Sequence, residues 1–380
     1  MKTFWIQPKI YYGSNSLDYL NELDAKKVLL ITDKYTIHLN AEEEVINRLK
    51  SASVKVFSEI EDASSLAVVK KGLACFLQED PDLMVALGGT AAIDAAKAIR
   101  FFCHQPAVHG SRKKLPFVVI PTTSGTGSEV TPYSVITGGE DNERMPLHDE
   151  RMLPDAVILN AQLTVVTSPS VTADTGMDLL THAIESYVSL EATEFTTLFS
   201  EKAIKLVFTH LLRAYRFGED LTARESLQLA SCMAGFAFVN SSLGVNHSIA
   251  HAMEAEFPLS HGRINAMLLP YIIEYNGGLC DGTLHSSEAA KKYMNIANML
   301  GLPCSTVEEG IRSLSTAVKL LNKKFNIPLT FQDSLIEKNT FEKSIPLIAK
   351  KAPQDVCTAG NPKQVKEMDL VYLLKWAYTG

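Results

Sequence analysis

The chain has 380 residues, of which 46% are hydrophobic and 21% are charged, and it contains 36 Lys and Arg against 43 Asp and Glu. The formal net charge of −7, without a block of basic residues, argues against nucleic acid as a partner. No apolar run approaches the roughly 18 residues that span a bilayer, and no export signal precedes the first strand-like run. We therefore expect a cytoplasmic protein of two domains that acts on small molecules.

The first half of the chain alternates short apolar runs with helical patterns. The apolar runs are 28–32, 54–60, 83–89 and 117–123, and the helical patterns between them are 41–50, 65–78 and 91–102. Runs of this length between helices are typical of buried parallel strands, so this half is predicted to be an α/β sheet domain. After Ser168 helical patterns dominate, as in 170–188 and 316–325. We predict an α/β nucleotide-binding domain over 1–167 and a helical domain over 168–380.

Two loops and one acid in the α/β half could bind a nucleotide. Gly88 and Gly89 separate a strand from a helix, where backbone N–H groups can meet a diphosphate, although such a pair is also an ordinary tight turn. The segment 120–131, "IPTTSGTGSEVT", could wrap a phosphate or ribose with its hydroxyls, or be a polar loop. Asp33 follows a strand and could bind an adenosine ribose and repel a 2′-phosphate, or cap a helix.

Two amphipathic segments of the helical half together carry one Asp and four His. Asp178 and His182 are four residues apart, and so are His247 and His251, so each pair lies on one helix face; His261 follows after a turn. The same spacing would also suit hydrogen-bonded pairs. Together these residues predict a metal site, because imidazoles and a carboxylate suit a divalent transition metal. Periodicity does not decide which of the three later histidines are ligands.

Four segments, in this order and at these separations, resemble the iron-containing alcohol dehydrogenases: "PTTSGTGSEVT", "TGMDLLTHAIES", "NHSIAHAMEAEFPLSHG" and "TAGNPK". The resemblance runs from about Phe4 to the end of the chain and is greatest to the microcompartment-associated 1-propanol dehydrogenases. It implies a Rossmann-like dinucleotide-binding domain followed by an all-helical metal-binding domain, the dehydroquinate synthase-like fold.

The resemblance also implies roles for particular residues. The metal ligands would be Asp178, His182, His247 and His261, which leaves His251 near the substrate and nicotinamide as a proton relay. Nucleotide contacts would come from Asp33, Gly88, Gly89, Thr90, Ala91, Asp94, Thr122, Thr123, Thr126, Val135 and Arg144. Tyr133 would lie near the substrate, and Leu243, one helical turn before His247, would border the open position of the metal.

These residues predict an oxidoreductase that interconverts short primary alcohols and aldehydes with NAD(H). The ion, Fe²⁺ with Zn²⁺ as the alternative, would act as a Lewis acid on the alcohol hydroxyl, and NAD would take the hydride. A homodimer is expected, with an aldehyde-producing enzyme or a microcompartment as its setting. A glycerol or 1,3-propanediol dehydrogenase of the same fold, a phosphate-substrate relative such as dehydroquinate synthase, and a non-catalytic nucleotide-binding regulatory protein are the alternatives.

The chain departs from the usual pattern of this family at several positions. Thr90 and Ala91 replace a Gly-Ser pair at the diphosphate loop, and Arg144 replaces a lysine that reaches the cofactor. Glu254 and Ser260 replace a Gly and a Pro before the last histidine. None of these changes removes a predicted metal ligand.

Overall fold

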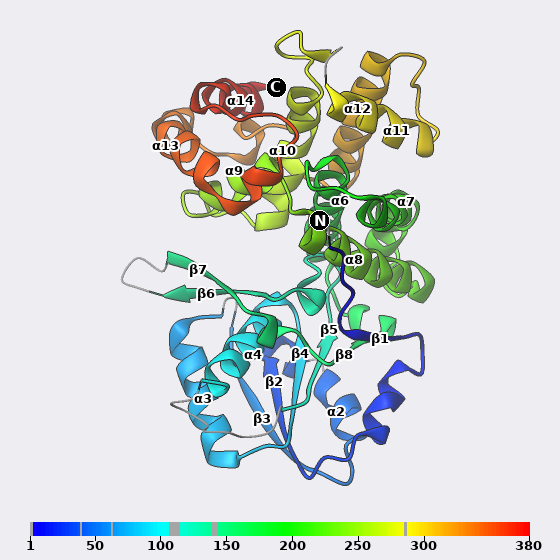
Figure 1. Cartoon of the computed structure of the whole chain (residues 1–380), viewed down its shortest axis with the longest axis vertical. Helices are drawn as coiled ribbons and strands as arrows, with labels where there is room; N and C mark the ends of the chain where they lie inside the picture. Colours follow the sequence, from blue (N-terminus) through cyan, green and yellow to red (C-terminus); the bar gives the residue numbers. More distant parts are fainter. Residues whose placement is uncertain (1–2, 39, 62–63, 106–114, 139–142, 285–286) are drawn as a thin grey trace. The chain divides into compact units, whose positions relative to one another are not determined.

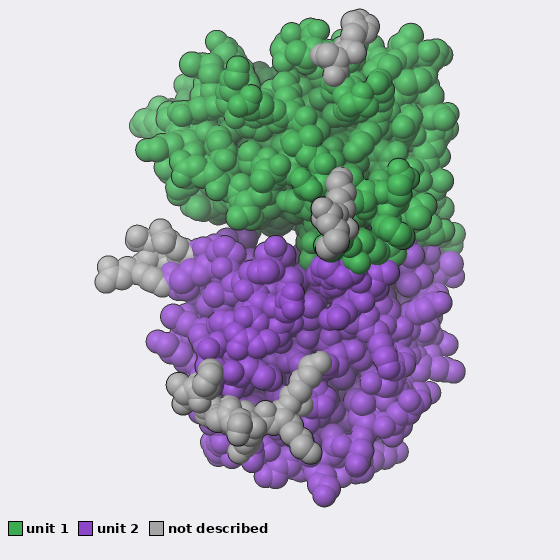
Figure 2. All heavy atoms as spheres, in the orientation of Figure 1, with its two compact units in different colours: residues 1–4, 168–217, 236–380 green, residues 5–167, 218–235 purple. Residues whose placement is uncertain are grey.

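The computed structural model describes residues 3–38, 40–61, 64–105, 115–138, 143–284 and 287–380. The chain forms two compact units, which Figure 2 shows in different colours. The helical unit comprises residues 1–4, 168–217 and 236–380, and the sheet unit comprises residues 5–167 and 218–235.

The sheet unit is built on six parallel strands in the order β1-β8-β5-β4-β2-β3. They are β1 (Lys9–Tyr12), β2 (Lys27–Asp33), β3 (Ser53–Ile60), β4 (Leu83–Gly88), β5 (Phe117–Pro121) and β8 (Ala156–Leu159). The central strands β4 and β5 are buried along their whole length, as continuous apolar runs predict. Strands β6 (Tyr133–Gly138) and β7 (Glu143–His148) form a separate antiparallel pair.

Helices cover both faces of this sheet because successive strand residues point to opposite sides. Val28 and Leu30 of β2 share one core with the helices η1 (Ser16–Glu22) and α2 (Ala41–Ile46). The helices α3 (Leu66–Glu79) and α4 (Thr90–Cys103) pack on the other side (Figure 1). The order of strands reverses between β2 and β4, so that the carboxyl ends of these two strands form the switch point where α/β sheets bind nucleotides.

The helical unit contains eight complete helices within the described residues. They are α6 (Pro169–Val188), α7 (Glu194–Arg216), α9 (Val245–Glu254), α10 (His261–Asn276), α11 (Glu288–Met299), α12 (Val307–Lys324), α13 (Lys338–Lys351) and α14 (Glu367–Thr379). Helix α10 contacts α6, α9, α12 and α14 and is central to the unit (Figure 1). No helix in the described ranges combines the length and apolar character that a membrane crossing requires. This pairing of a parallel sheet with a helical unit confirms the predicted fold class.

One helical segment groups with the sheet rather than with the other helices. Residues 218–235, most of α8 (Leu221–Ser241), belong to the sheet unit. A side chain at Gly235 would lie 2.5 Å from Val130, and the Gln228 amide donates to the Pro121 carbonyl at 3.2 Å. Helical periodicity marks this segment as a helix but does not indicate which core receives it. The domain boundary at 167/168 stays a prediction.

Candidate active site

Three helices bring the predicted metal ligands together in the helical unit. Asp178 and His182 lie on α6, His247 lies on α9, and His261 is the first residue of α10. One ligand atom from each of Asp178, His247 and His261 lies within 4.8 Å of the other two. His182 lies beside this group, since its Nδ1 is 3.8 Å from Asp178 Oδ2 and its ring centroid is 4.4 Å from that of His247.

The arrangement fits a metal ion. Among the described residues, His182 Nδ1 and His247 Nε2 are buried without a hydrogen-bond partner, which is costly unless something else binds them. His247 Nε2 and His261 Nε2 each lie 3.7 Å from Asp178 Oδ1. Ligands about 2.0–2.2 Å from one ion are roughly 3–3.5 Å apart, so these distances are only slightly larger than those of a bound site.

The charges of the site also suit a cation. Burial alone would raise the pKa of the Asp178 carboxyl, but the surrounding imidazoles hold that pKa well below its usual range. Burial lowers the pKa of His182 to about 3, so this ring is neutral and can donate a lone pair.

A close approach between α6 and α10 holds these ligands at this distance. An added Cβ at Gly262 would lie 2.2 Å from the carbonyl oxygen of Asp174 and 3.2 Å from Asp178 Cβ. Any side chain at position 262 would therefore separate the helix that carries His261 from the helix that carries Asp178. The glycine that follows the last histidine in the sequence is required by this contact.

His247 is oriented by a carboxylate on α6. Its Nδ1 donates to Glu185 Oε2, and the other oxygen of Glu185 accepts from the Asn246 backbone N–H at 2.8 Å. The Val245 N–H donates to the Asn361 side chain at 3.1 Å, so the first turn of α9 is satisfied by two distant segments. Although burial opposes it, Glu185 raises the pKa of His247 to about 9, and this more basic ring is a stronger metal ligand.

His251 lies beside the metal ligands but has a different partner. Its ring stacks on that of His261 at 5.3 Å between centroids, and its Nδ1 donates to Asp355 Oδ2 at 2.9 Å. Asp355 Oδ1 accepts from the Cys357 N–H at 2.8 Å. Although burial opposes it, the bond with His251 lowers the pKa of Asp355, so the carboxylate is charged at neutral pH. His251, Asp355 and Cys357 could also group as metal ligands, but these hydrogen bonds already account for the two oxygens of Asp355.

In the sheet unit, the predicted nucleotide residues surround the ends of β2 and β4. Gly88 has a φ of +148°, and a side chain there would lie 2.4 Å from Asp33 Oδ2. Asp33 Oδ1 accepts from the Thr36 N–H at 2.7 Å and Oδ2 accepts from the Gly89 N–H at 3.3 Å. Asp33 therefore caps α1 (Lys34–His38) and also faces the glycine turn, and its binding of a ribose stays a prediction.

The unusual Thr90 makes contact with the second predicted loop. Its hydroxyl lies 3.0 Å from that of Thr126, and the Thr122 N–H donates to the Gly88 carbonyl at 3.0 Å. A Cβ added at Gly89 would lie 3.6 Å from the Thr123 side chain, so the glycine faces that residue. Ala91 is half-buried in the first turn of α4. The two loops are thus tied together, and the extra hydroxyl of Thr90 has a partner in this chain.

The remaining predicted nucleotide residues lie further along α4 and the β6-β7 pair. Asp94 is buried, and its two oxygens accept from the Ser128 hydroxyl at 2.7 Å and the Val135 N–H at 2.8 Å. These bonds hold the second loop against α4. Arg144 is exposed on β7, opposite Thr137 of β6.

The two predicted substrate residues belong to different units. Tyr133 is 42% exposed at the start of β6, with its ring 4.6 Å from that of His148. Leu243 is buried, but it does not lie one helical turn before His247 as predicted. Helix α9 begins at Val245 with Gly244 as its N-cap, and Ser242 adopts a left-handed φ of 63°. Leu243 is therefore in the turn between α8 and α9.

Comparison with known proteins identifies the family. Models of iron-containing alcohol dehydrogenases match residues 7–161 and, for the C-terminal part, residues 172–378. The chain belongs to the iron-containing alcohol dehydrogenase family. It is 36% identical to the NADPH-dependent butanol dehydrogenase of Clostridium saccharobutylicum, covering 100% of this chain and 99% of that protein. It is also 36% identical to the 1-propanol dehydrogenase PduQ of Citrobacter freundii, covering 96% of both.

Longer relatives and a solved structure agree with this assignment. The aldehyde-alcohol dehydrogenase of Streptococcus pneumoniae serotype 4 is 36% identical, and this chain spans 46% of its length. The crystal structure of a 1,3-propanediol oxidoreductase superposes with a TM-score of 0.89 at 29% identity over 100% of both chains. As a member of this family the protein is an oxidoreductase, and the predicted resemblance and enzyme class are confirmed.

Sequence reasoning missed several residues of this alcohol dehydrogenase site. Glu185 lies seven residues after Asp178 on the same helix, so helical spacing could have indicated it. Asp355 and Asn361 are more than 100 residues from their partners in α9, and no local pattern could have found them.

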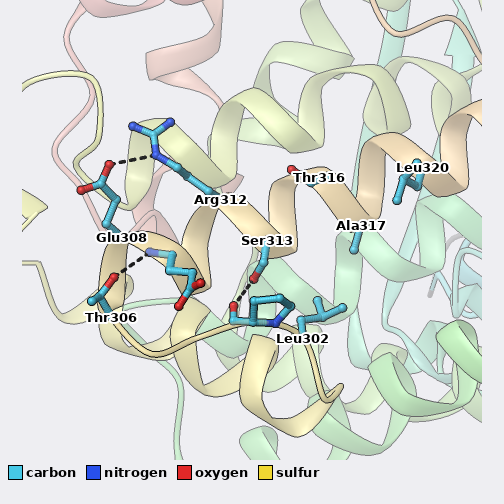
Figure 3. Close-up of a pocket in the computed structure, with 10 residues that line it drawn as sticks. Leu302, Thr306, Glu308, Arg312, Ser313, Thr316, Ala317 and Leu320 are labelled. Carbon is cyan, nitrogen blue, oxygen red and sulfur yellow. Dashed lines mark hydrogen bonds and ion pairs between the residues drawn. The ribbon is translucent and has the colours of Figure 1, made fainter.

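A surface pocket of this alcohol dehydrogenase lies elsewhere. It measures about 530 Å³ and is lined by α12 and the segment before it, including Leu302, Ser313 and Leu320 (Figure 3). Several polar groups there pair with one another, as Arg312 does with Glu308 at 2.9 Å. None of the predicted site residues lines it, and we assign it no function.

Proposed function

We propose that this protein is a metal-dependent, NAD(H)-linked alcohol dehydrogenase that interconverts short primary alcohols and their aldehydes. The observation that carries the proposal is the cluster of Asp178, His247 and His261 with His182 beside it. Two imidazole nitrogens there are buried without protein partners in the described structure. The test is reduction of an aldehyde series with NADH by protein of defined metal content. Absence of NADH oxidation with any short aldehyde would contradict it.

Each group in the proposed site has a separate task. Asp178, His182, His247 and His261 would hold a divalent ion, which when bound polarises the alcohol or aldehyde oxygen while the nicotinamide carries the hydride. Asp355 keeps the proton of His251 on Nδ1, which leaves Nε2 to accept the hydroxyl proton during alcohol oxidation. In the reverse direction, the same nitrogen returns the proton. Partial burial lowers the pKa of His251, so the ring is neutral at pH 7 and able to accept that proton.

We infer that Asp33 gives the enzyme a preference for NAD(H) over NADP(H). One relative is NADPH-dependent, so family membership does not determine this choice. The carboxylate of Asp33 lies at the switch point of the sheet, where it would accept hydrogen bonds from a ribose and repel a 2′-phosphate. Asp33→Gly is expected to reduce the preference for NADH over NADPH, measured as the ratio of the two kcat/KM values, by about 1–3 kcal/mol, roughly 5- to 150-fold.

Because Asp33 also caps α1, this variant needs a stability control. Asp82 is a matched control, since its carboxylate likewise accepts backbone N–H groups, from Lys26 at 3.0 Å and Lys27 at 3.0 Å, but from a different part of the sheet unit. Asp82→Gly should lower the melting temperature without changing the cofactor ratio. A wild-type enzyme that already prefers NADPH would disprove the role of Asp33.

We propose that the substrate pocket is narrow and apolar, and that Tyr133 and Leu243 each contribute to the choice of substrate. One methylene in such a pocket is worth about 1–3 kcal/mol, so kcat/KM should differ measurably among ethanal, propanal and butanal. Glycerol should be poor because its extra hydroxyls would be buried without partners. If the enzyme oxidised glycerol as fast as it oxidises 1-propanol, its substrate class would instead be that of the glycerol dehydrogenases.

The proposal also includes the metal ion and the partners of the enzyme. The donor set of imidazoles and a carboxylate suits Fe²⁺ and also Zn²⁺, and the family name favours iron. We propose a homodimer that works beside an aldehyde-producing enzyme, in a microcompartment or free. An aldehyde-producing partner is supported by one relative, which is named an aldehyde-alcohol dehydrogenase.

A further inference from the structure

Helix α9 ends on an acid that the helix itself does not favour. Glu254 is its last residue, at the end where the helix dipole disfavours a negative charge. Its side chain is only 13% exposed, so the carboxylate is not simply solvated. The helix dipole would instead favour a basic residue in this last turn. The position of Glu254 is therefore explained by a contact outside α9.

That contact is with His261. His247, His251 and Glu254 are spaced i, i+4 and i+7, so they lie along one face of α9. The chain then turns through 255–260 and returns His261 to the end of this face, where its Nδ1 donates to Glu254 Oε2 at 3.2 Å. The other ring nitrogen of His261, Nε2, lies 3.7 Å from Asp178 Oδ1.

The backbone of His261 is held independently of Glu254. The Ser260 hydroxyl donates to Asp174 Oδ2 at 2.6 Å, and the Arg263 guanidinium donates to Asp174 Oδ1 at 3.1 Å. Both contacts anchor the first turn of α10 to α6. Loss of the Glu254 carboxylate should therefore free the imidazole ring without displacing the helix that carries it.

We propose that Glu254 is a positioning residue that strengthens retention of the divalent ion through His261. This inference rests on the proposed function, because it takes His261 to be a ligand. By accepting from Nδ1, Glu254 fixes the tautomer in which Nε2 carries a lone pair, and its charge makes the ring a better donor. In this structure that lone pair faces the Asn265 side-chain amide at 3.0 Å, a contact that a bound ion would replace. Glu185 does the same for His247, so two of the three proposed imidazole ligands donate a hydrogen bond from Nδ1 to a carboxylate.

The test measures metal release rather than turnover. Wild-type protein, Glu254→Gln and Glu254→Asp are loaded with Zn²⁺, and its transfer to an excess of a colorimetric chelator is followed. Gln keeps the size of the side chain and removes its charge. Zn²⁺ affinity should fall about 10- to 100-fold in Glu254→Gln, with correspondingly faster release, and Glu254→Asp should release Zn²⁺ more slowly than Glu254→Gln.

Glu256→Gln is the matched control. It removes the same charge two residues away, and the Glu256 carboxylate contacts Ser344 at 3.4 Å. It should release Zn²⁺ at the wild-type rate. Equal release from wild type and Glu254→Gln would overturn the inference, and so would equal acceleration in both glutamine variants, because net charge rather than contact would then explain it. Wild-type protein that retains no Zn²⁺ would instead contradict the proposed metal site.

Discussion

Replacing His261 by Ala is expected to remove the bound ion and abolish turnover. Three of the four proposed ligands would remain. Water would take the place of the His261 imidazole beside Asp178, and water holds the ion less firmly than a protein ligand. Metal content by elemental analysis should fall from about one ion per chain toward zero, and NADH-dependent aldehyde reduction should fall with it. Structural integrity can be followed by the melting temperature of the metal-free proteins.

His251→Ala is the comparison that separates ligands from the proton relay. Its ring stacks on His261, but its Nδ1 is paired with Asp355, so its loss should leave the ion in place. A metal-free His251→Ala protein beside a metal-replete His261→Ala protein would reverse the two assignments.

The second large effect is expected at the His251–Asp355 pair. His251→Ala should lower kcat about 10²- to 10⁴-fold, the usual contribution of general acid–base catalysis, with the ion retained. Asp355→Asn should also lower kcat, because an amide can donate to Nδ1 and so favour the wrong tautomer of His251. This loss should not exceed that of His251→Ala.

A double-mutant cycle shows whether Asp355 acts through His251. If it does, adding Asp355→Asn to His251→Ala should cause little further loss of kcat. Ser248→Ala removes another contact to the Asp355 carboxylate, at 3.3 Å, without removing its bond to His251, and should have a small effect. Fully multiplicative losses in the double variant would mean that Asp355 has a separate role, such as holding the segment Val356–Gly360.

Local patterns in the sequence were sufficient for the features that depend on neighbouring residues. The buried strands β2, β4 and β5 are continuous apolar runs, and α6 has the cap Ser168 followed by Pro169 at its start. The spacing of four residues placed Asp178 and His182 on one face, and this spacing is a property of any α-helix. Such features could be predicted because their physical cause lies within a few residues along the chain.

Other elements have no local signal. Strand β1 is only four residues long, with a sequence that is not continuously buried, and it exists as a strand because it pairs with β8 nearly 150 residues away. The helical segment 218–235 joins the sheet unit because Gly235 fits against Val130. The pairing of a strand and the packing of a helix depend on which surfaces meet in the folded chain. Hydrophobic periodicity shows that a surface is buried but not which element buries it.

The site shows the same division most clearly in its histidines. His247 and His251 are equivalent in the sequence, one turn apart on an amphipathic helix, and residue spacing alone could not say which would bind metal. In the folded chain His247 Nε2 faces Asp178 while Glu185 holds Nδ1, and His251 Nδ1 faces Asp355. Helical spacing was enough to predict that imidazoles and a carboxylate share helix faces. Their separate environments arise only on folding, because the carboxylates that distinguish them come from segments about 60 and 100 residues away.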